Sequence, residues 1–234
     1  KKVSLGYNTG TFHHSINLKE NREAMLQKYV ALGLLKEHQS GFSIFGKGCL
    51  VFPLKNQKGQ IVSFYFREID ETKKVKHYYL KDRQGLYSIN LHPNTQKLIL
   101  TESIIDAITL SQYRQDLSIL ANYGTEGSAE QLEAISQLKE LKEIVLFFDG
   151  DTPGIKGAEK LAKTLLASNN NLNLKIVQTP KNEDVNSLLE GHNSNILTEL
   201  IKEAKPFKLE EKPQEKPVSQ PIFSFNFDNK EKRT

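Results

Sequence analysis

The sequence predicts an α/β fold, in which a parallel sheet flanked by helices follows a smaller α+β subdomain with an antiparallel hairpin. Two patterns indicate this. Over residues 95–204, short apolar runs alternate with helical patterns, which is typical of right-handed βαβ crossovers and a parallel sheet. Over residues 1–94, two aromatic-rich apolar runs flank a polar turn that contains glycine, the pattern of a β-hairpin. The 234 residues suffice for one large domain or two small ones, since domains usually have about 100–200 residues.

The first subdomain, residues 1–94, is expected to combine a helix with antiparallel strands. Apolar side chains near helical spacing predict a short amphipathic helix over residues 21–35. The hairpin strands are expected at 49–54 and 61–66, and residues 75–80 are a candidate third strand.

The second unit, residues 95–204, carries local signals for where its helices begin. Ser128 and Gln131 have the spacing of a capping box, and Pro153 stands at an early helical position, where proline is tolerated. Strands are expected at 97–101, 117–121, 143–148 and 172–178, and helices at 104–113, 128–141, 153–167, 186–189 and 196–204.

Residues 205–234 are expected to form a disordered tail. They are rich in Pro, Lys and Glu, and such a composition buries too little apolar surface to fold alone. Within the tail, IFSFNF (222–227) alternates apolar and polar residues and could add as a strand to the sheet edge of a partner. A tail with no dedicated partner is the alternative.

Composition excludes several classes of protein. No run approaches the ~18–20 apolar residues of a membrane span, and the first residues lack the apolar core of a signal peptide. We therefore expect a cytoplasmic protein without a membrane partner. The single cysteine, Cys49, can form neither an internal disulfide nor a cysteine-based zinc cluster, so no zinc is expected in this chain.

The net charge of +4 hides a split along the chain. Residues 1–94 hold 15 Lys and Arg against 7 Asp and Glu, whereas residues 95–204 hold 10 against 16. A basic block beside an acidic one suggests a surface that holds a polyanion next to one that holds cations. Chance in surface composition explains the split about equally well.

Acidic residues follow two of the predicted parallel strands, where open parallel sheets bind ligands. Glu102 comes directly after the first strand, and Asp149 and Asp151 follow the strand at 143–148. Carboxylates two residues apart in extended chain can face one point, and their oxygens suit Mg²⁺ or Mn²⁺. Asp-Gly-Asp is also an ordinary turn sequence, and Glu102 alone could be a residue at a helix N-terminus that the helix dipole favours. Their coincidence at the strand ends favours a metal site, with Asp106 as a weaker member one helical turn after Glu102.

Segments of the second unit resemble the TOPRIM domain, which bacterial-type primases, topoisomerases and some nucleases share. The Glu and Asp-x-Asp of its signature are matched by Glu102, Asp149 and Asp151. Earlier segments resemble the primase catalytic core, so the similarity covers roughly residues 4–192, a length that topoisomerases would not share. The TOPRIM-like segments are TESIIDAITL (101–110), NYGTEGSAEQL (122–132) and LFFDGDTPGIKGAEKLA (146–162), and the primase-like ones SLGYNTGTF (4–12), ALGLLKE (31–37), CLVFPLKNQKGQIVSFYFRE (49–68) and QGLYSIN (84–90).

The resemblance implies a TOPRIM-type sheet and a nucleotidyltransferase that makes short primers from nucleoside triphosphates on a single-stranded DNA template. It implies more than one Mg²⁺ or Mn²⁺ ion, bound by Glu102, Asp149 and Asp151. Asp106 and Asp184 are weaker metal candidates. The residues assigned to nucleotide binding are Gly124, Thr125, Lys47 and Arg67, and those assigned to template binding are Lys47, Arg67, Tyr78, Lys81 and Arg83, with Tyr79 as a further stacking candidate.

The sequence also departs from the family pattern. The usual Glu-Gly-Tyr-x-Asp reads Glu102-Ser103-Ile104-Ile105-Asp106, and Cys49 aligns with a basic residue. The zinc-binding module that usually precedes this core and the helicase-binding module that follows it are not recognised here. These departures fit a divergent primase from a mobile element or phage, with a helicase or other replication protein as a candidate partner of the tail. Two alternatives stay open: a TOPRIM nuclease or topoisomerase that cleaves DNA, and an inactive module that binds single-stranded DNA.

Overall fold

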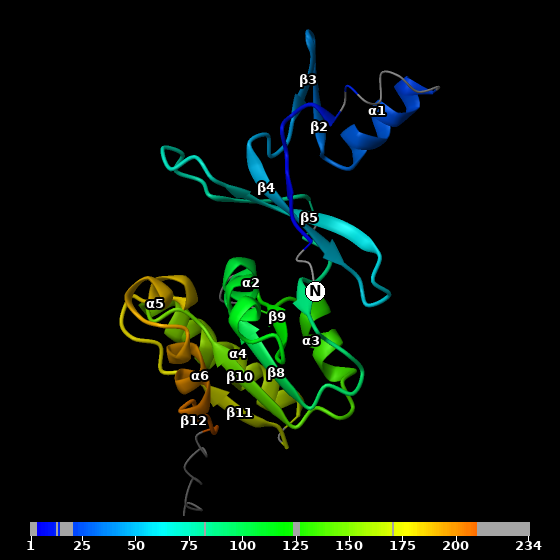
Figure 1. Ribbon diagram of the computed structural model, residues 1–234. Coiled ribbons are helices and arrows are strands. Elements are labelled where there is room, and N and C mark those ends of the chain that lie inside the picture. Colours follow the sequence, from blue (N-terminus) through cyan, green and yellow to red (C-terminus); the bar gives the residue numbers. More distant parts are fainter. Residues whose placement is uncertain are drawn as a thin grey trace, which may run out of the picture.

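The computed structural model describes residues 4–12, 14, 21–81, 83–123, 127–169 and 171–209. It contains a six-stranded sheet, a four-stranded antiparallel sheet and a two-stranded hairpin (Figure 1). The four-stranded sheet lies between the hairpin and the six-stranded sheet. The predicted fold class is therefore confirmed, since a largely parallel sheet flanked by helices follows a smaller unit with antiparallel strands. Among the described residues, no helix is long and apolar enough to cross a membrane.

Four central strands of the six-stranded sheet run parallel, as predicted, and an antiparallel strand closes each edge. The edge strands β7 (Ser88–Ile89) and β12 (Lys205–Pro206) move the limits of this unit. Because β7 belongs to the sheet, the unit begins before residue 95. At the other end, the backbone N–H of Phe207 donates to the carbonyl oxygen of Leu174, so regular structure continues past residue 204. The expectation of a tail that starts at 205 is therefore wrong for its first residues, while residues 210–234, with the segment 222–227, lie outside the described residues. The sheet order is β12-β11-β10-β8-β9-β7, with β8 at Lys97–Thr101, β9 at Ser118–Ala121, β10 at Glu143–Phe147 and β11 at Asn173–Ile176.

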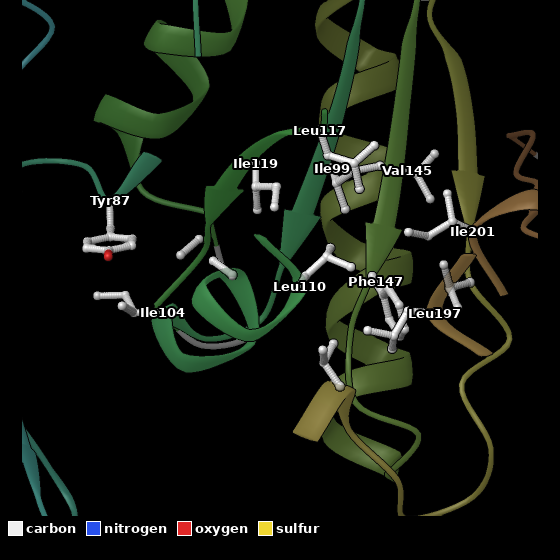
Figure 2. Close-up of a cluster of buried hydrophobic side chains, with 14 of the residues drawn as sticks. Tyr87, Ile99, Ile104, Leu110, Leu117, Ile119, Val145, Phe147, Leu197 and Ile201 are labelled. Carbon is white, nitrogen blue, oxygen red and sulfur yellow. The ribbon is translucent and has the colours of Figure 1, made fainter. Parts of the chain in front are cut away.

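Helices cover both faces of this sheet, which explains why its strands are apolar without alternation. In β8, the side chain of Ile99 packs on one face, in the cluster drawn in Figure 2, whereas Leu98 and Leu100 pack on the other. All three are buried. The first face is covered by α2 (Ile104–Tyr113), α5 (Val185–Gly191) and α6 (Asn195–Lys202), and the second by α3 (Ala129–Ser136) and α4 (Thr152–Ser168).

The capping box predicted for α3 is present, because Ser128 Oγ accepts from the backbone N–H of Gln131, whose side chain accepts from Ser128 N–H. The helix ends at Ser136, earlier than the predicted 141. Three acidic residues singled out from the sequence also sit at helix starts. Asp151 is the N-cap of α4, Asp184 is the N-cap of α5, and Asp106 completes a capping box with Ser103 at the start of α2.

The predicted hairpin forms the centre of the four-stranded sheet, whose order is β1-β4-β5-β6. Because side chains alternate across a strand, Tyr65 and Arg67 of β5 face the six-stranded unit, while Phe66 packs with Cys49 on the opposite face. These strands are β1 (Gly6–Tyr7), β4 (Cys49–Lys55), β5 (Ile61–Glu68) and β6 (His77–Tyr79).

The predicted helix over 21–35 is shorter than expected: α1 spans Arg22–Ala31. Gly33 has a φ of +76°, which ends the helix because other residues rarely adopt that conformation. The chain then forms a hairpin that the sequence did not predict, and Leu35 packs with Leu26 of the helix. Its strands are β2 (Leu35–His38) and β3 (Gly41–Ile44).

Candidate active site

A cleft of about 910 Å³ lies between the four-stranded sheet and the carboxyl ends of the parallel strands. One wall is acidic and the opposite wall is basic and aromatic. The acidic wall comes from loops after β8 and β10 and from the starts of α2 and α5, and the basic wall comes from β5, β6 and the chain after β6. The polar and aromatic lining residues on the first side are Glu102, Ser103, Asp106, Tyr123, Asp149, Asp184 and Asn186. Those on the second side are Tyr65, Arg67, Lys76, His77, Tyr79 and Arg83, together with two acidic residues, Glu68 and Glu71.

The three residues of the acidic signature converge on the first turn of α4. The backbone N–H of Asp149 lies 3.3 Å from Oε2 of Glu102 and donates to it. A Cβ atom placed on Gly154 would lie 2.4 Å from the carbonyl oxygen of Asp149 and 2.9 Å from Oε2 of Glu102. It would also lie 3.0 Å from Oδ1 of Asp151. The glycine therefore lets the helix start approach the carboxylates closely.

Burial and neighbouring charges raise the pKa values of three carboxyl groups on this wall. Burial, followed by the charges of Asp106 and Glu102, raises the pKa of Asp149 to about 8. Burial is also the largest cause for Asp106, whose pKa rises to about 6, and for Glu102, whose pKa is raised as well. Burial and mutual repulsion thus make it costly for these carboxylates to be charged together, and a bound cation would relieve that cost.

The carboxylates differ in how far other groups already engage them. Asp151 Oδ1 accepts from Gly154 N–H at 2.7 Å, and Asp184 Oδ1 accepts from two backbone N–H groups of α5. Asp106 accepts from Ser103 and from Asn186 Nδ2, at 2.6 and 2.8 Å. In the described part of the chain, no hydrogen bond reaches the carboxylate of Asp149.

The donor set fits a hard divalent cation such as Mg²⁺ or Mn²⁺, because every side-chain donor on the acidic wall is an oxygen. Over the residues that the structure describes, no three His, Cys, Asp or Glu side chains stand ready as a ligand group. Glu102 and Asp149 line the cleft, whereas Asp151 does not. Binding of one cation by Glu102, Asp149 and Asp151 together would therefore need side-chain rotation, above all of Asp151, whose Oδ1 accepts from Gly154 N–H.

Hydrogen bonds and stacking organise the basic wall. Arg67 Nη1 contacts Nε2 of His77, and the other ring nitrogen of His77 lies 2.8 Å from the Tyr65 hydroxyl. The guanidinium carbon of Arg83 lies 4.5 Å from the ring centre of Tyr79, at cation–π distance. Both arginines are thus held against aromatic or imidazole rings at the cleft surface.

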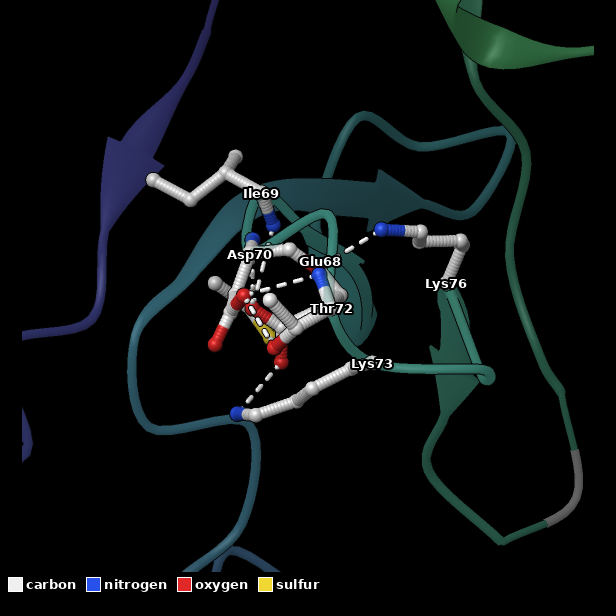
Figure 3. A network of polar contacts seen from close by, with 7 residues as sticks. Glu68, Ile69, Asp70, Thr72, Lys73 and Lys76 are labelled. Carbon is white, nitrogen blue, oxygen red and sulfur yellow. Dashed lines mark hydrogen bonds and ion pairs between the residues drawn. The ribbon is translucent and has the colours of Figure 1, made fainter.

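A loop between β5 and β6 completes this wall, and Figure 3 shows what holds it. Glu68 is buried, yet its carboxylate accepts from the backbone N–H groups of Ile69 and Asp70 and from Lys73 Nζ at 2.8 Å. Lys76 Nζ donates to the carbonyl oxygen of Asp70 at 2.6 Å. The loop therefore presents Ile69 and Lys76 to the cleft from a fixed base.

The basic residues named from the sequence do not all reach the cleft. Arg67 and Arg83 line it, but Lys47 and Lys81 are exposed elsewhere, Lys47 lying against Gly10. Gly124 and Thr125 lie outside the described residues.

Of the two adjacent tyrosines, Tyr79 lines the cleft and Tyr78 does not. Tyr78 packs on the opposite face of the sheet, 6.1 Å from the ring of Phe45, because neighbouring residues of a strand face opposite ways. Of the two tyrosines named from the sequence as stacking candidates, Tyr79 is therefore the one at the cleft, and a role of either in template binding stays a prediction. Sequence reasoning also missed His77 and Tyr65, although period-two alternation from Arg67 would have found Tyr65.

Two family models match successive parts of the chain. Residues 1–87 match the N-terminal domain of the DNA primase catalytic core, and residues 99–189 match a Toprim-like domain. The DNA primase of Staphylococcus epidermidis is 26% identical over 216 residues, which cover 88% of this chain and 35% of that protein. The DNA primase of Legionella pneumophila is 25% identical, over 88% of this chain and 37% of that protein. The chain thus spans about a third of the length of these curated relatives.

Among solved structures, a DNA primase domain from Pseudomonas aeruginosa matches with a TM-score of 0.70 at 21% identity. The match covers 86% of this chain and 66% of that one. At this identity, the likeness establishes the fold alone.

Proposed function

This chain belongs to the DnaG-like DNA primases, since it joins the N-terminal domain of their catalytic core to a Toprim-like domain, and we propose that it synthesises primers. The reaction would extend a strand along a single-stranded DNA template from nucleoside triphosphates. A 3′-hydroxyl oxygen attacks the α-phosphorus of the incoming nucleotide, a P–O bond forms, and the bond to pyrophosphate breaks. The proposal places the protein in the cytoplasm, where template and nucleotides occur together.

The observation that carries the proposal is one cleft with two opposed walls. Phosphoryl transfer depends mainly on positioning and on neutralising charge, and it needs both cation ligands and phosphate ligands within reach of one substrate. Glu102 and Asp149 lie on the acidic wall, and Arg67, Lys76 and Arg83 lie on the basic one. Cations held by Glu102 and Asp149 would offset the repulsion between the acidic wall and an anionic substrate.

The acidic residues would hold divalent cations, Mg²⁺ or Mn²⁺. Glu102, Asp149 and Asp151 are the proposed ligands, and Asp106 and Asp184 lie close enough to tune them through their charge. Two such ions, when bound, stabilise the attacking and leaving oxygens together. Asp106 is buried and bonded to Ser103 and Asn186, so its part is to fix the start of α2 beside Glu102.

The basic wall would orient the substrate. Arg67 and Lys76 are proposed to contact the triphosphate, and Tyr79, with Arg83 over its ring, offers a surface against which a base can stack. Lys47 and Lys81, outside the cleft, are proposed to contact the template backbone farther along its path. Gly124 and Thr125 remain proposed nucleotide-binding residues, and the tail remains the proposed contact for a helicase or another replication protein.

Primer synthesis on a panel of single-stranded templates tests the proposal directly, with Mg²⁺ and Mn²⁺ compared. We expect labelled nucleotides to be incorporated without strand cleavage, and Asp149→Ala to abolish incorporation while single-stranded DNA binding survives. Glu140→Ala, at an exposed position away from the cleft, is the matched control. Template cleavage without extension would point to a TOPRIM nuclease, and binding without either reaction to an inactive module. Either result rejects the proposal.

A further inference from the structure

His77 occupies the centre of the basic wall, although the sequence gives it no motif. It lies directly opposite Arg67 in the β5–β6 pairing, and Tyr65 lies opposite Tyr79 in the same pairing. All four side chains line the cleft. The rings of His77 and Tyr65 stack with centroids 5.9 Å apart and an angle of 28° between their planes. The imidazole is therefore held by its two cross-strand neighbours.

The two hydrogen bonds of His77 leave it one arrangement of protons. A guanidinium can only donate, so Nε2 of His77 must accept from Arg67 Nη1. The neutral ring then carries its proton on Nδ1, which donates to the Tyr65 hydroxyl at 2.8 Å. A second ring proton would set an N–H group against an N–H group of Arg67. Burial, followed by the charge of Arg67, lowers the pKa of His77 and so favours this neutral form.

This arrangement fixes the direction of Arg67. The guanidinium is planar, so an acceptor that holds Nη1 also sets where the remaining N–H groups of the fork point. Arg67 is only partly buried and lines the same cleft as Glu102 and Asp149. Without the imidazole, its long side chain would sample several rotamers before it met a phosphate, and that freedom weakens binding.

We propose that His77 is a positioning residue, whose Nε2 acceptor, in the tautomer whose Nδ1 proton is donated to Tyr65, holds the Arg67 guanidinium ready for the triphosphate of the nucleotide. The proposal rests on the proposed function, because it assumes that a nucleoside triphosphate enters the cleft. His77 itself needs no contact with the substrate. Its contribution is to the affinity for the nucleotide and to the alignment of its phosphates.

Two substitutions of His77 separate this role from a merely structural one. In His77→Gln, the side-chain carbonyl can reach the place of Nε2 and still accept from Arg67. In His77→Asn, the shorter amide can keep the bond to Tyr65 but leaves Arg67 without its acceptor. We expect the KM for the nucleotide to stay within about threefold of the parent value in the Gln variant and to rise about tenfold in the Asn variant, the size expected for losing one hydrogen bond to a charged group. The kcat is expected to change less than the KM.

A double-mutant cycle with Arg67→Met supplies the decisive readout. If His77 acts through Arg67, then His77→Asn has no further effect on nucleotide affinity once Arg67 is absent. Calorimetric binding of ATP without template measures this affinity apart from synthesis, and thermal unfolding verifies that each variant is folded. Should His77→Asn fail to fold, Tyr65→Phe removes the acceptor of the Nδ1 proton while keeping the ring, and the same loss of affinity is expected.

The outcomes distinguish the two proposals. Suppose that the parent protein makes primers and binds ATP. The role of His77 is then overturned if His77→Asn binds ATP as tightly as the parent, or if its loss of affinity adds in full to that of Arg67→Met. The primase proposal stays intact in both cases. A His77→Gln variant as impaired as His77→Asn also overturns it. A parent protein that neither binds ATP nor makes primers overturns both.

Discussion

At the scale of single residues, Gly154 limits how the start of α4 packs against two of the carboxylates. Any side chain there would meet the carbonyl oxygen of Asp149 and the carboxylate of Glu102 within 3 Å. Gly154→Ala should therefore shift the start of α4 or the loop after β10, at a cost in stability of about 1–3 kcal/mol, and primer synthesis should fall at least as far as in Glu102→Ala. Gly191→Ala, where a Cβ meets nothing within 4 Å, is the control. Denaturant unfolding measures the change in stability, and a primer-synthesis assay measures the change in activity. A fully active Gly154→Ala protein would contradict this close packing.

Glu68 gives a prediction about pH. Hydrogen bonds from Lys73 and from the backbone of Asp70 hold the pKa of Glu68 below its ordinary value. A carboxyl whose pKa is lower in the folded state stabilises the protein above its unfolded pKa, and that stabilisation is lost as the pH falls through the folded value. Replacing Glu68 with Gln should therefore destabilise the protein at neutral pH, and the gap in the free energy of unfolding between the two proteins should close on acidification below about pH 4.5. Urea unfolding at several pH values measures this difference in the free energy of unfolding. A difference that stays constant with pH would contradict the lowered pKa of Glu68.

The element scale shows which features the sequence could predict. The parallel strands at 97–101 and 143–148 and the acidic residues after them were found because they are continuous local signals, an apolar run and then a polar turn. The edge strands β7 and β12 were missed because each has two residues, too few for any periodicity, and pairs only with strands far along the chain. The place of His77 beside Arg67 was missed for the same reason, since it depends on the register between β5 and β6.

The start of α4 tests whether Asp151 serves the helix, the metal or both. As N-cap it accepts from Gly154 N–H, and asparagine caps helices about as well as aspartate. Asp151→Asn should therefore keep the stability of the parent, whereas Asp151→Ala should lose about 1 kcal/mol. Both should lose primer synthesis if the carboxylate also binds a cation. Calorimetric titration of Mn²⁺ alongside thermal unfolding separates the two roles, and an active Asn variant would restrict Asp151 to capping.

At the scale of the whole molecule, the charge split of the sequence becomes a division between the two walls. The basic block supplies β5, β6 and the chain after β6, and the acidic block supplies the ends of β8 and β10. Much of the acidic excess lies elsewhere: exposed side chains such as Glu133 and Glu140 are far along α3 and the loop after it. Only a small part of the charged residues lines the cleft, so the composition of the two blocks alone could not locate it.

This division predicts how binding of single-stranded DNA depends on salt. Each phosphate contact that a Lys or Arg makes to a single strand contributes about 0.7 to the slope of log affinity against log salt concentration. If Lys47 and Lys81 contact the template backbone outside the cleft, Lys47→Ala and Lys81→Ala should each lower the slope by about that amount, with little sequence dependence. Lys163→Ala, exposed on α4, should leave it unchanged. Fluorescence anisotropy with labelled oligonucleotides from about 50 to 200 mM salt measures the slopes. Equal slopes for the parent and both variants would exclude Lys47 and Lys81 as phosphate contacts, because a side chain in contact with a phosphate contributes to counterion release.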